Sequence, residues 1–125
     1  MGESVVERLD GDFAFVVWDP KRETLLCARD PFGVKPLFYR AEHGAFLVAS
    51  EPGQVRAGTN GPIGADEEML SRAFVGEYRD DGRCFLEGVR RVMPGSMLRV
   101  TREGAEEILY WRPEELPPLP HRDPA

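Results

Sequence analysis

Two cysteines and two histidines are the first candidates for a nucleophile, a base or a metal ligand in this 125-residue chain. Cys27 stands within an apolar run that reads as a buried strand, where burial raises the pKa of a thiol and leaves it inert. Cys84 follows a charged run with a glycine, so we expect it to be more exposed. His43 and His121 have no metal-like spacing and neither stands near Cys84. The pattern predicts no catalytic, cofactor-binding or metal-binding residues.

The segment that runs from Arg29 to Tyr39 has the most distinctive residue types. It joins two apolar runs and contains the charged pair Arg29-Asp30, then Gly33, Lys35 and Pro36. Glycine suits a backbone position with positive φ, and proline fixes its own φ. These residues predict a tight corner between strands, and the charge pair would fix the corner and satisfy its exposed backbone groups.

Both faces of the segment from Asp12 to Trp18 are apolar. Phe13, Phe15 and Val17 point to one face, and Ala14, Val16 and Trp18 point to the other. A strand that is buried on both faces is an inner strand of a layered structure. Residues 19–22 predict a turn, after which residues 24–29 return as a second apolar strand.

Two further hairpins follow the same rules. They are strands 37–40 and 45–49, and strands 96–101 and 106–111 with Gly104 in the turn. We expect five aromatic side chains in the core: Trp18, Tyr39, Phe46, Tyr110 and Trp111.

The sequence also predicts two helices. Asp66 caps a helix that ends at about Val75 before Gly76. The apolar face of this helix carries Met69, Leu70, Ala73 and Phe74. Ser50 and Glu51 cap a shorter helix, and residues 56–64 read as a loop. The fold class is therefore α+β, dominated by antiparallel sheet.

Composition limits the function classes. Charged residues make up 30% of the chain and the net charge is −6, which argues against binding to nucleic acid. No apolar stretch approaches the ~20 residues that span a bilayer, and no signal peptide is visible, so we expect a cytoplasmic protein with no membrane partner. Five prolines between residues 113 and 125 predict a linker or tail after a domain at residues 1–112.

Four blocks of residues in register resemble the glutaminase domain of the asparagine synthetase family. They are Leu9-Asp10-Gly11-Asp12-Phe13-Ala14-Phe15-Val16-Val17-Trp18-Asp19, the Arg29–Tyr39 segment, Val48-Ala49-Ser50-Glu51, and Val92-Met93-Pro94-Gly95. The resemblance covers about residues 5–111. It implies a class II glutamine amidotransferase domain within a four-layer αββα sandwich of the N-terminal-nucleophile type. The implied activity is hydrolysis of glutamine, which supplies ammonia to an ATP-dependent amidation.

The resemblance also implies what this chain lacks. The nucleophile of the family is a cysteine at position 2, and here position 2 is Gly2. The chain resembles the C-terminal part of the domain, so we expect it to be inactive alone. ATP and magnesium are expected only in a synthetase domain or protein. Arg29 and Lys35 would then face that partner near the ammonia route, whereas helix capping is sufficient to explain Ser50.

Three readings stay open: a segment of a glutaminase, a non-catalytic scaffold as in β-lactam-synthetase-like relatives, and one half of a split glutaminase whose other half is a separate chain. A truncated gene would also explain the pattern. An inner strand without its neighbours would expose apolar surface. We therefore expect self-association, or a loosely packed monomer that binds a hydrophobic dye.

Overall fold

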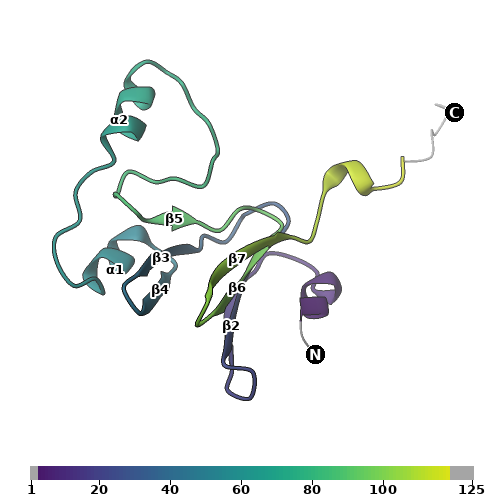
Figure 1. Ribbon diagram of the computed structural model, residues 1–125. Coiled ribbons are helices and arrows are strands. Elements are labelled where there is room, and N and C mark those ends of the chain that lie inside the picture. The colour runs from purple at the N-terminus through teal and green to yellow at the C-terminus, as the bar shows by residue number, and fades with distance from the viewer. Residues whose placement is uncertain (1–2, 119–125) are drawn as a thin grey trace, which may run out of the picture.

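The computed structural model describes residues 3–118, which form two antiparallel β-sheets and two short α-helices (Figure 1). The first sheet has the order β1 (Ala14–Asp19), β2 (Thr24–Arg29), β6 (Ser96–Thr101) and β7 (Gly104–Leu109). The second sheet has the order β4 (Ala45–Ala49), β3 (Phe38–Glu42) and β5 (Arg90–Arg91). The predicted α+β class with antiparallel pairing is confirmed.

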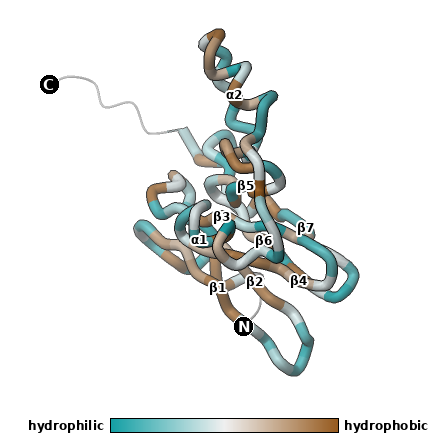
Figure 2. The backbone as a smooth tube through the Cα atoms, turned by 90° about the vertical axis from the view of Figure 1, so that its left-hand side faces the viewer, coloured by the Kyte–Doolittle hydropathy of each residue, from teal (hydrophilic) through white to brown (hydrophobic). Residues whose placement is uncertain are grey.

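The helical elements are η1 (Glu3–Arg8), α1 (Pro52–Ala57), α2 (Glu67–Phe74) and η2 (Pro113–Glu115). The strands β1 and β2 are mainly hydrophobic and the turn between them is hydrophilic (Figure 2). No helix among residues 3–118 is long and apolar enough to cross a membrane.

The main core lies where the two sheets pack against each other. Cys27 of β2 and Leu98 of β6 are buried there, and Tyr39 and Phe46 of the second sheet pack against them with their rings 5.6 Å apart. Short helices cover the outer faces of the two sheets. On the first sheet, Val6 of η1 packs against the outer face. In the same way, α1 packs its buried valine on β3 and β4.

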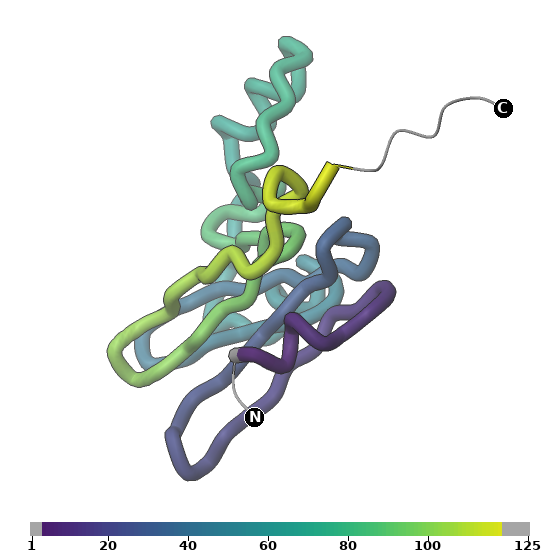
Figure 3. The backbone as a smooth tube through the Cα atoms, turned by 90° about the vertical axis from the view of Figure 1, so that its right-hand side faces the viewer, coloured from purple at the N-terminus to yellow at the C-terminus, as the bar shows by residue number. Residues whose placement is uncertain are grey.

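The first predicted strand forms, but it is not an inner strand. Within the described residues β1 is an outer strand of its sheet, and the β1–β2 hairpin protrudes beyond the other strands (Figure 3). Val16, Val17 and Trp18 are 42%, 51% and 56% exposed. The expectation that Trp18 lies in the core is therefore wrong, because no described strand covers that edge of the sheet.

Several local predictions are refined by the structure. The turn at residues 19–22 forms, and the Asp19 carboxylate accepts bonds from the N–H groups of Lys21 and Arg22. The last hairpin turns at residues 102–103, so Gly104 with φ 145° begins β7 instead of lying in the turn. The two-residue strand β5 was not predicted, since two arginines give no apolar periodicity.

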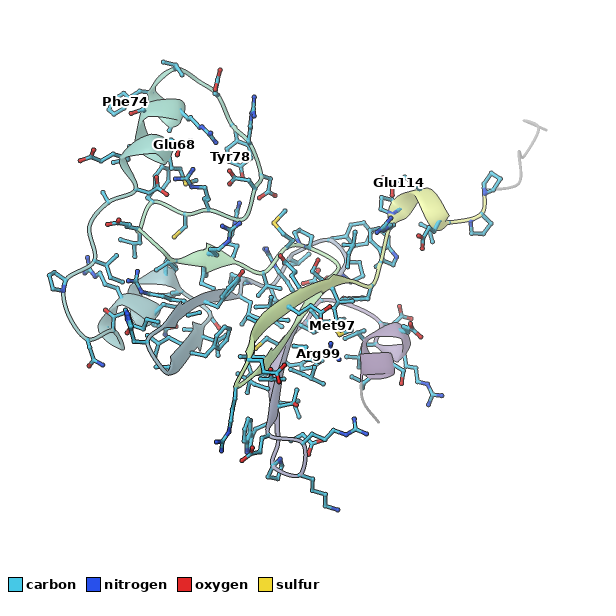
Figure 4. All side chains as sticks on the ribbon, in the orientation of Figure 1. Glu68, Phe74, Tyr78, Met97, Arg99 and Glu114 are labelled. Carbon is cyan, nitrogen blue, oxygen red and sulfur yellow. The ribbon has the colours of Figure 1, made fainter. Side chains whose placement is uncertain are left out.

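The helix α2 stands apart from both sheets (Figure 1). Asp66 caps it as predicted, with its carboxylate accepting the Met69 N–H at 3.0 Å. The helix ends at Phe74, which is 90% exposed and lies on the outer side of the helix (Figure 4). The predicted helix is confirmed, but the apolar face of α2 does not cover a sheet.

The stretch after Trp111 begins with the single turn η2, whose first residue is Pro113. Residues 119–125, with His121, lie outside the described residues. The linker prediction for this stretch stays a prediction.

Candidate functional site at the Arg29–Asp30 corner

The corner after β2 is organised around the Asp30 carboxylate, which is fully buried. Its oxygens accept three backbone N–H groups, from Phe32 at 3.1 Å, Val34 at 3.0 Å and Lys35 at 2.9 Å. Burial by itself would raise the pKa of Asp30. The three backbone hydrogen bonds and the neighbouring Arg29 charge outweigh it and hold the pKa below its usual range. The carboxylate therefore stays ionised and fixes the path of the loop.

Arg29 satisfies the carbonyl groups of the same loop. Its guanidinium donates to the carbonyl oxygens of Lys35 at 2.8 Å, Gly33 at 2.6 Å and Val92 at 2.9 Å. The residue is only 8% exposed, and its own carbonyl accepts the Tyr110 hydroxyl at 2.6 Å. Burial and the neighbouring Arg91 charge lower the pKa of Arg29. Each side chain of the pair thus satisfies backbone groups that the corner leaves without strand partners.

Gly33 occupies a position that no other residue fits without strain. Its φ is +65°, in the left-handed region, and a Cβ there would lie 2.7 Å from Cγ of Pro94. Pro94 belongs to the fourth block of the sequence resemblance. The next residue, Gly95, donates its N–H to the Asp30 carbonyl at 2.9 Å. The sequence alone does not place this block against the corner, because the two segments in contact are 60 or more residues apart along the chain.

The outer side of the corner is apolar and open. Phe32 is 77% exposed and Val34 is 55% exposed, while Lys35 and Pro36 are also exposed. The Phe32 ring lies 5.4 Å from the ring of Trp111, the last residue before the proline-rich stretch. The motif is therefore divided into an internal part that builds the loop and an external part that is available for contact.

Ser50 and Glu51 lie away from this network, at the start of α1. Glu51 is the N-cap residue and donates its own N–H to Oε1 of Gln54 at 3.2 Å. Ser50 is exposed and precedes the cap, so the cap falls one residue later than the serine.

Both thiols are buried. Cys27 is fully buried in the core, and this burial raises its pKa to about 12. Cys84 is more exposed than Cys27, as expected, but it is buried as well. It is only 8% exposed, and its Sγ lies 3.3 Å from the Val89 carbonyl oxygen. Among residues 3–118 no group of three or more histidine, cysteine or acidic side chains could hold a metal ion.

A family model described as glutamine amidotransferase domain matches residues 1–111, so the chain belongs to this family. The family relationship predicted from the sequence is confirmed.

Several relatives are similar over most of the chain. Asparagine synthetase (glutamine-hydrolyzing) 3 of Bacillus subtilis (strain 168) is 37% identical over 113 residues, which are 90% of this chain and 18% of the relative. Amidase chyE of Penicillium rubens is 37% identical over 123 residues, 96% of this chain and 17% of the relative. A putative asparagine synthetase (glutamine-hydrolyzing) of Mycobacterium bovis is 39% identical over 112 residues, 86% of this chain and 17% of the relative. The chain thus spans less than a fifth of the length of these relatives.

Proposed function

We propose that this chain supplies the two-sheet core of a glutamine amidotransferase domain in an asparagine-synthetase-like system. In that system, glutamine is hydrolysed to glutamate and ammonia, and the ammonia serves an ATP-dependent amidation elsewhere. The family match over residues 1–111 carries this proposal. The finer fold that we propose is the αββα sandwich of N-terminal-nucleophile hydrolases. It is supported by two sheets packed face to face with a short helix on each outer side.

The chain contributes scaffold to this reaction rather than the attacking group. Both cysteines are buried, and a buried thiol with a raised pKa is a poor nucleophile. The attacking group therefore comes from another part of the amidotransferase domain, on the same polypeptide or on a second one. As part of this proposal, ATP and magnesium belong to the synthetase domain or protein of the system.

The outer side of the corner is the proposed contact with that synthetase part. Phe32 and Val34 present apolar surface, and Lys35 adds a positive charge beside it. Trp111 packs on Phe32, so the segment that follows Trp111 starts beside this proposed contact surface. Arg29 would act on this contact only by holding the loop, since its guanidinium is bound to internal carbonyl groups.

A chimera tests the proposal. Residues 5–111 replace the matching segment of the Bacillus subtilis relative, which is 37% identical over 113 residues and keeps the rest of its own sequence. We expect glutamine-dependent amidation to survive within about tenfold. Activity with ammonia supplied directly is the internal control for the synthetase part. A chimera that uses ammonia fully but has lost all use of glutamine would contradict the proposal.

The scaffold reading is favoured over catalysis by one observation, the burial of both thiols. A non-catalytic module and one half of a split glutaminase differ in what accompanies them in the genome. A neighbouring frame that begins Met-Cys-Gly supports a split enzyme. A synthetase frame without any such cysteine supports a permanent scaffold.

A further inference from the structure

A cavity of about 470 Å³ lies between α2 and the second sheet. The helix contributes Met69, Arg72 and Ala73, whose spacing places them on one face. The sheet contributes Phe38 of β3 and Arg91 of β5. Residues of the wide loop that leads from α2 to β5 complete the lining (Figure 1). The volume lies within the roughly 300–1,000 Å³ that is usual for small-molecule sites.

The lining of this cavity is mainly apolar. Besides the apolar residues of α2 and β3, it includes Cys84, Phe85 and Leu86 of the loop. No residue of α2 is buried, so the apolar face of this helix meets the cavity instead of a sheet. An apolar occupant would therefore give α2 the burial that the helix lacks.

One polar group of the lining lacks an acceptor. Among residues 3–118, the Arg91 Nε is the buried side-chain polar atom without a hydrogen-bond partner, whereas Nη2 of the same guanidinium donates to Asp80. Burial lowers the pKa of Arg91, but a hydrogen bond with the Tyr78 hydroxyl and the charge of Asp80 outweigh burial and raise it. The guanidinium is therefore charged. A buried N–H of a charged group is costly without an acceptor, and a ligand oxygen would remove that cost.

The charges around the cavity indicate that this oxygen belongs to an uncharged ligand. Three arginines of the lining already bind carboxylates: Arg72 binds Glu68 and Asp81, Arg83 binds Asp66 and Glu68, and Arg91 binds Asp80. The other two charged residues of the lining, Glu77 and Arg79, have opposite signs. Since four carboxylates face three arginines, no excess positive charge is left to compensate a buried anion.

We propose that the cavity between α2 and the second sheet binds an uncharged, mainly apolar small molecule whose carbonyl oxygen accepts a hydrogen bond from the Arg91 Nε. Ketones, esters and amides carry such an oxygen. The apolar part of the ligand packs between Met69 and Ala73 of α2 and Phe38 of β3, so the ligand ties α2 to the second sheet. This inference goes beyond the proposed function and does not depend on it.

Three naphthalenes of nearly equal shape test the inference on the full 125-residue chain. Acetylnaphthalene carries the carbonyl oxygen, isopropenylnaphthalene replaces that oxygen by a methylene, and naphthoate has a carboxylate at the same ring position. The methyl groups of the four methionines are isotope-labelled for NMR, so that Met69 reports binding and the buried Met97 reports the core. We expect acetylnaphthalene to bind about tenfold more tightly than either of the other two. It gains a hydrogen bond over the alkene, and it buries no charge.

Arg91→Lys tests the donor. The lysine keeps the charge beside Asp80 but places a methylene where the Nε stands. The preference for acetylnaphthalene over isopropenylnaphthalene should fall from about tenfold to about twofold or less. The control is Arg90→Lys, on the neighbouring exposed arginine of β5, which is not part of the lining and should keep the preference.

Ala73→Phe tests the place of binding. The added ring takes up space in the cavity, so acetylnaphthalene should bind about tenfold more weakly or worse. The control is Ser71→Phe, at an exposed position of the same helix outside the lining, and should bind within about twofold of the wild-type chain. Because no residue of α2 is buried, neither substitution disturbs a core.

Equal affinity for acetylnaphthalene and isopropenylnaphthalene would overturn the inference, because the Arg91 Nε would then have no role in binding. Naphthoate that binds as tightly as the ketone would also overturn it, as would normal binding to Ala73→Phe. The same holds if none of the three compounds moves the Met69 signal. Thermal melts check each variant, and the three compounds together with Ala73→Phe decide the question if Arg91→Lys does not fold. The chimera's amidation activity is a separate readout, so either proposal can fail while the other stands.

Discussion

At the scale of single residues, Arg29 and Asp30 show how two adjacent charged side chains satisfy the two kinds of backbone group, carbonyl oxygens and N–H groups. Asp30 collects three N–H groups, and Arg29 donates to three carbonyl groups of which one, that of Val92, lies 63 residues further along the chain. A pair of apolar side chains of the same size would leave these backbone groups without partners. The geometry makes Arg29 and Asp30 structural determinants of the corner that exposes Phe32 and Lys35.

Replacing Arg29 by lysine should destabilise the fold although the charge is kept. A lysine ammonium cannot reach three carbonyl oxygens in one plane, so at least one buried carbonyl loses its donor. We expect Arg29→Lys to lower the free energy of unfolding by about 2–4 kcal/mol in urea denaturation. The control Arg102→Lys, on an exposed arginine of the β6–β7 turn, should change it by less than about 0.5 kcal/mol. Equal effects at the two positions would contradict the role given to Arg29.

The lowered pKa of Asp30 predicts how stability depends on pH. Because the folded-state pKa lies below the unfolded one, the stabilisation is fully present above the unfolded value of about 3.9 and is lost as pH falls through the folded pKa. Asp30→Asn should be less stable at pH 7 and should show a flatter fall in stability between about pH 5 and 2. Unfolding curves across that range measure it. A parallel fall in wild type and variant would refute the assignment.

At the scale of elements, the sequence predicts local structure well where one residue type dictates it. The residue types at a few neighbouring positions are enough to predict the turn after β1, the cap at Asp66 and the main strands. The position of β1 at an edge was not predictable, because apolar residues on both faces indicate burial whether or not the covering strand is present. The burial of Cys84 was not predictable, because a hydrophilic run precedes a residue that the structure turns inward.

The helix α2 is held by charge more than by packing. Arg83 donates to both oxygens of Asp66 at 2.8 and 2.7 Å and to Glu68 at 2.8 Å, while no residue of α2 is buried. The pKa values of Asp66 and Glu68 both lie below their usual ranges. For Asp66 the main cause is the hydrogen bond from the Met69 N–H, and for Glu68 it is the hydrogen bond from Arg83.

Asp66→Ala removes both the cap and the ion pair, so it should loosen α2 alone. We expect amide exchange of residues 67–74 to become about fivefold faster, which corresponds to the roughly 1 kcal/mol of a lost cap, without faster exchange in β2 or β6. Glu67→Ala is the control, because it leaves Asp66 and Arg83 in place. Uniform acceleration across the sheets would mean that α2 is part of the global fold.

At the scale of the whole molecule, the chain has a closed core between its sheets and an open edge at β1. The core is continuous across both sheets, so we expect a folded chain rather than a disordered one. The edge leaves Val16, Val17 and Trp18 in solvent. The isolated chain should therefore bind a hydrophobic dye at tens of micromolar. A compact monomer in sedimentation with a cooperative melt and no dye binding would contradict the open edge.

The central claim is that this amidotransferase segment provides structure and not the nucleophile, and ammonia release from glutamine tests it directly. The purified 125-residue chain at tens of micromolar, with Cys27→Ala/Cys84→Ala beside it, should release no ammonia above a blank without protein. The prediction follows from the burial of both thiols and the raised pKa of Cys27. Release that the double variant abolishes would make a buried thiol catalytic. Release that it leaves unchanged would reveal a nucleophile outside both cysteines, and either result would contradict the account.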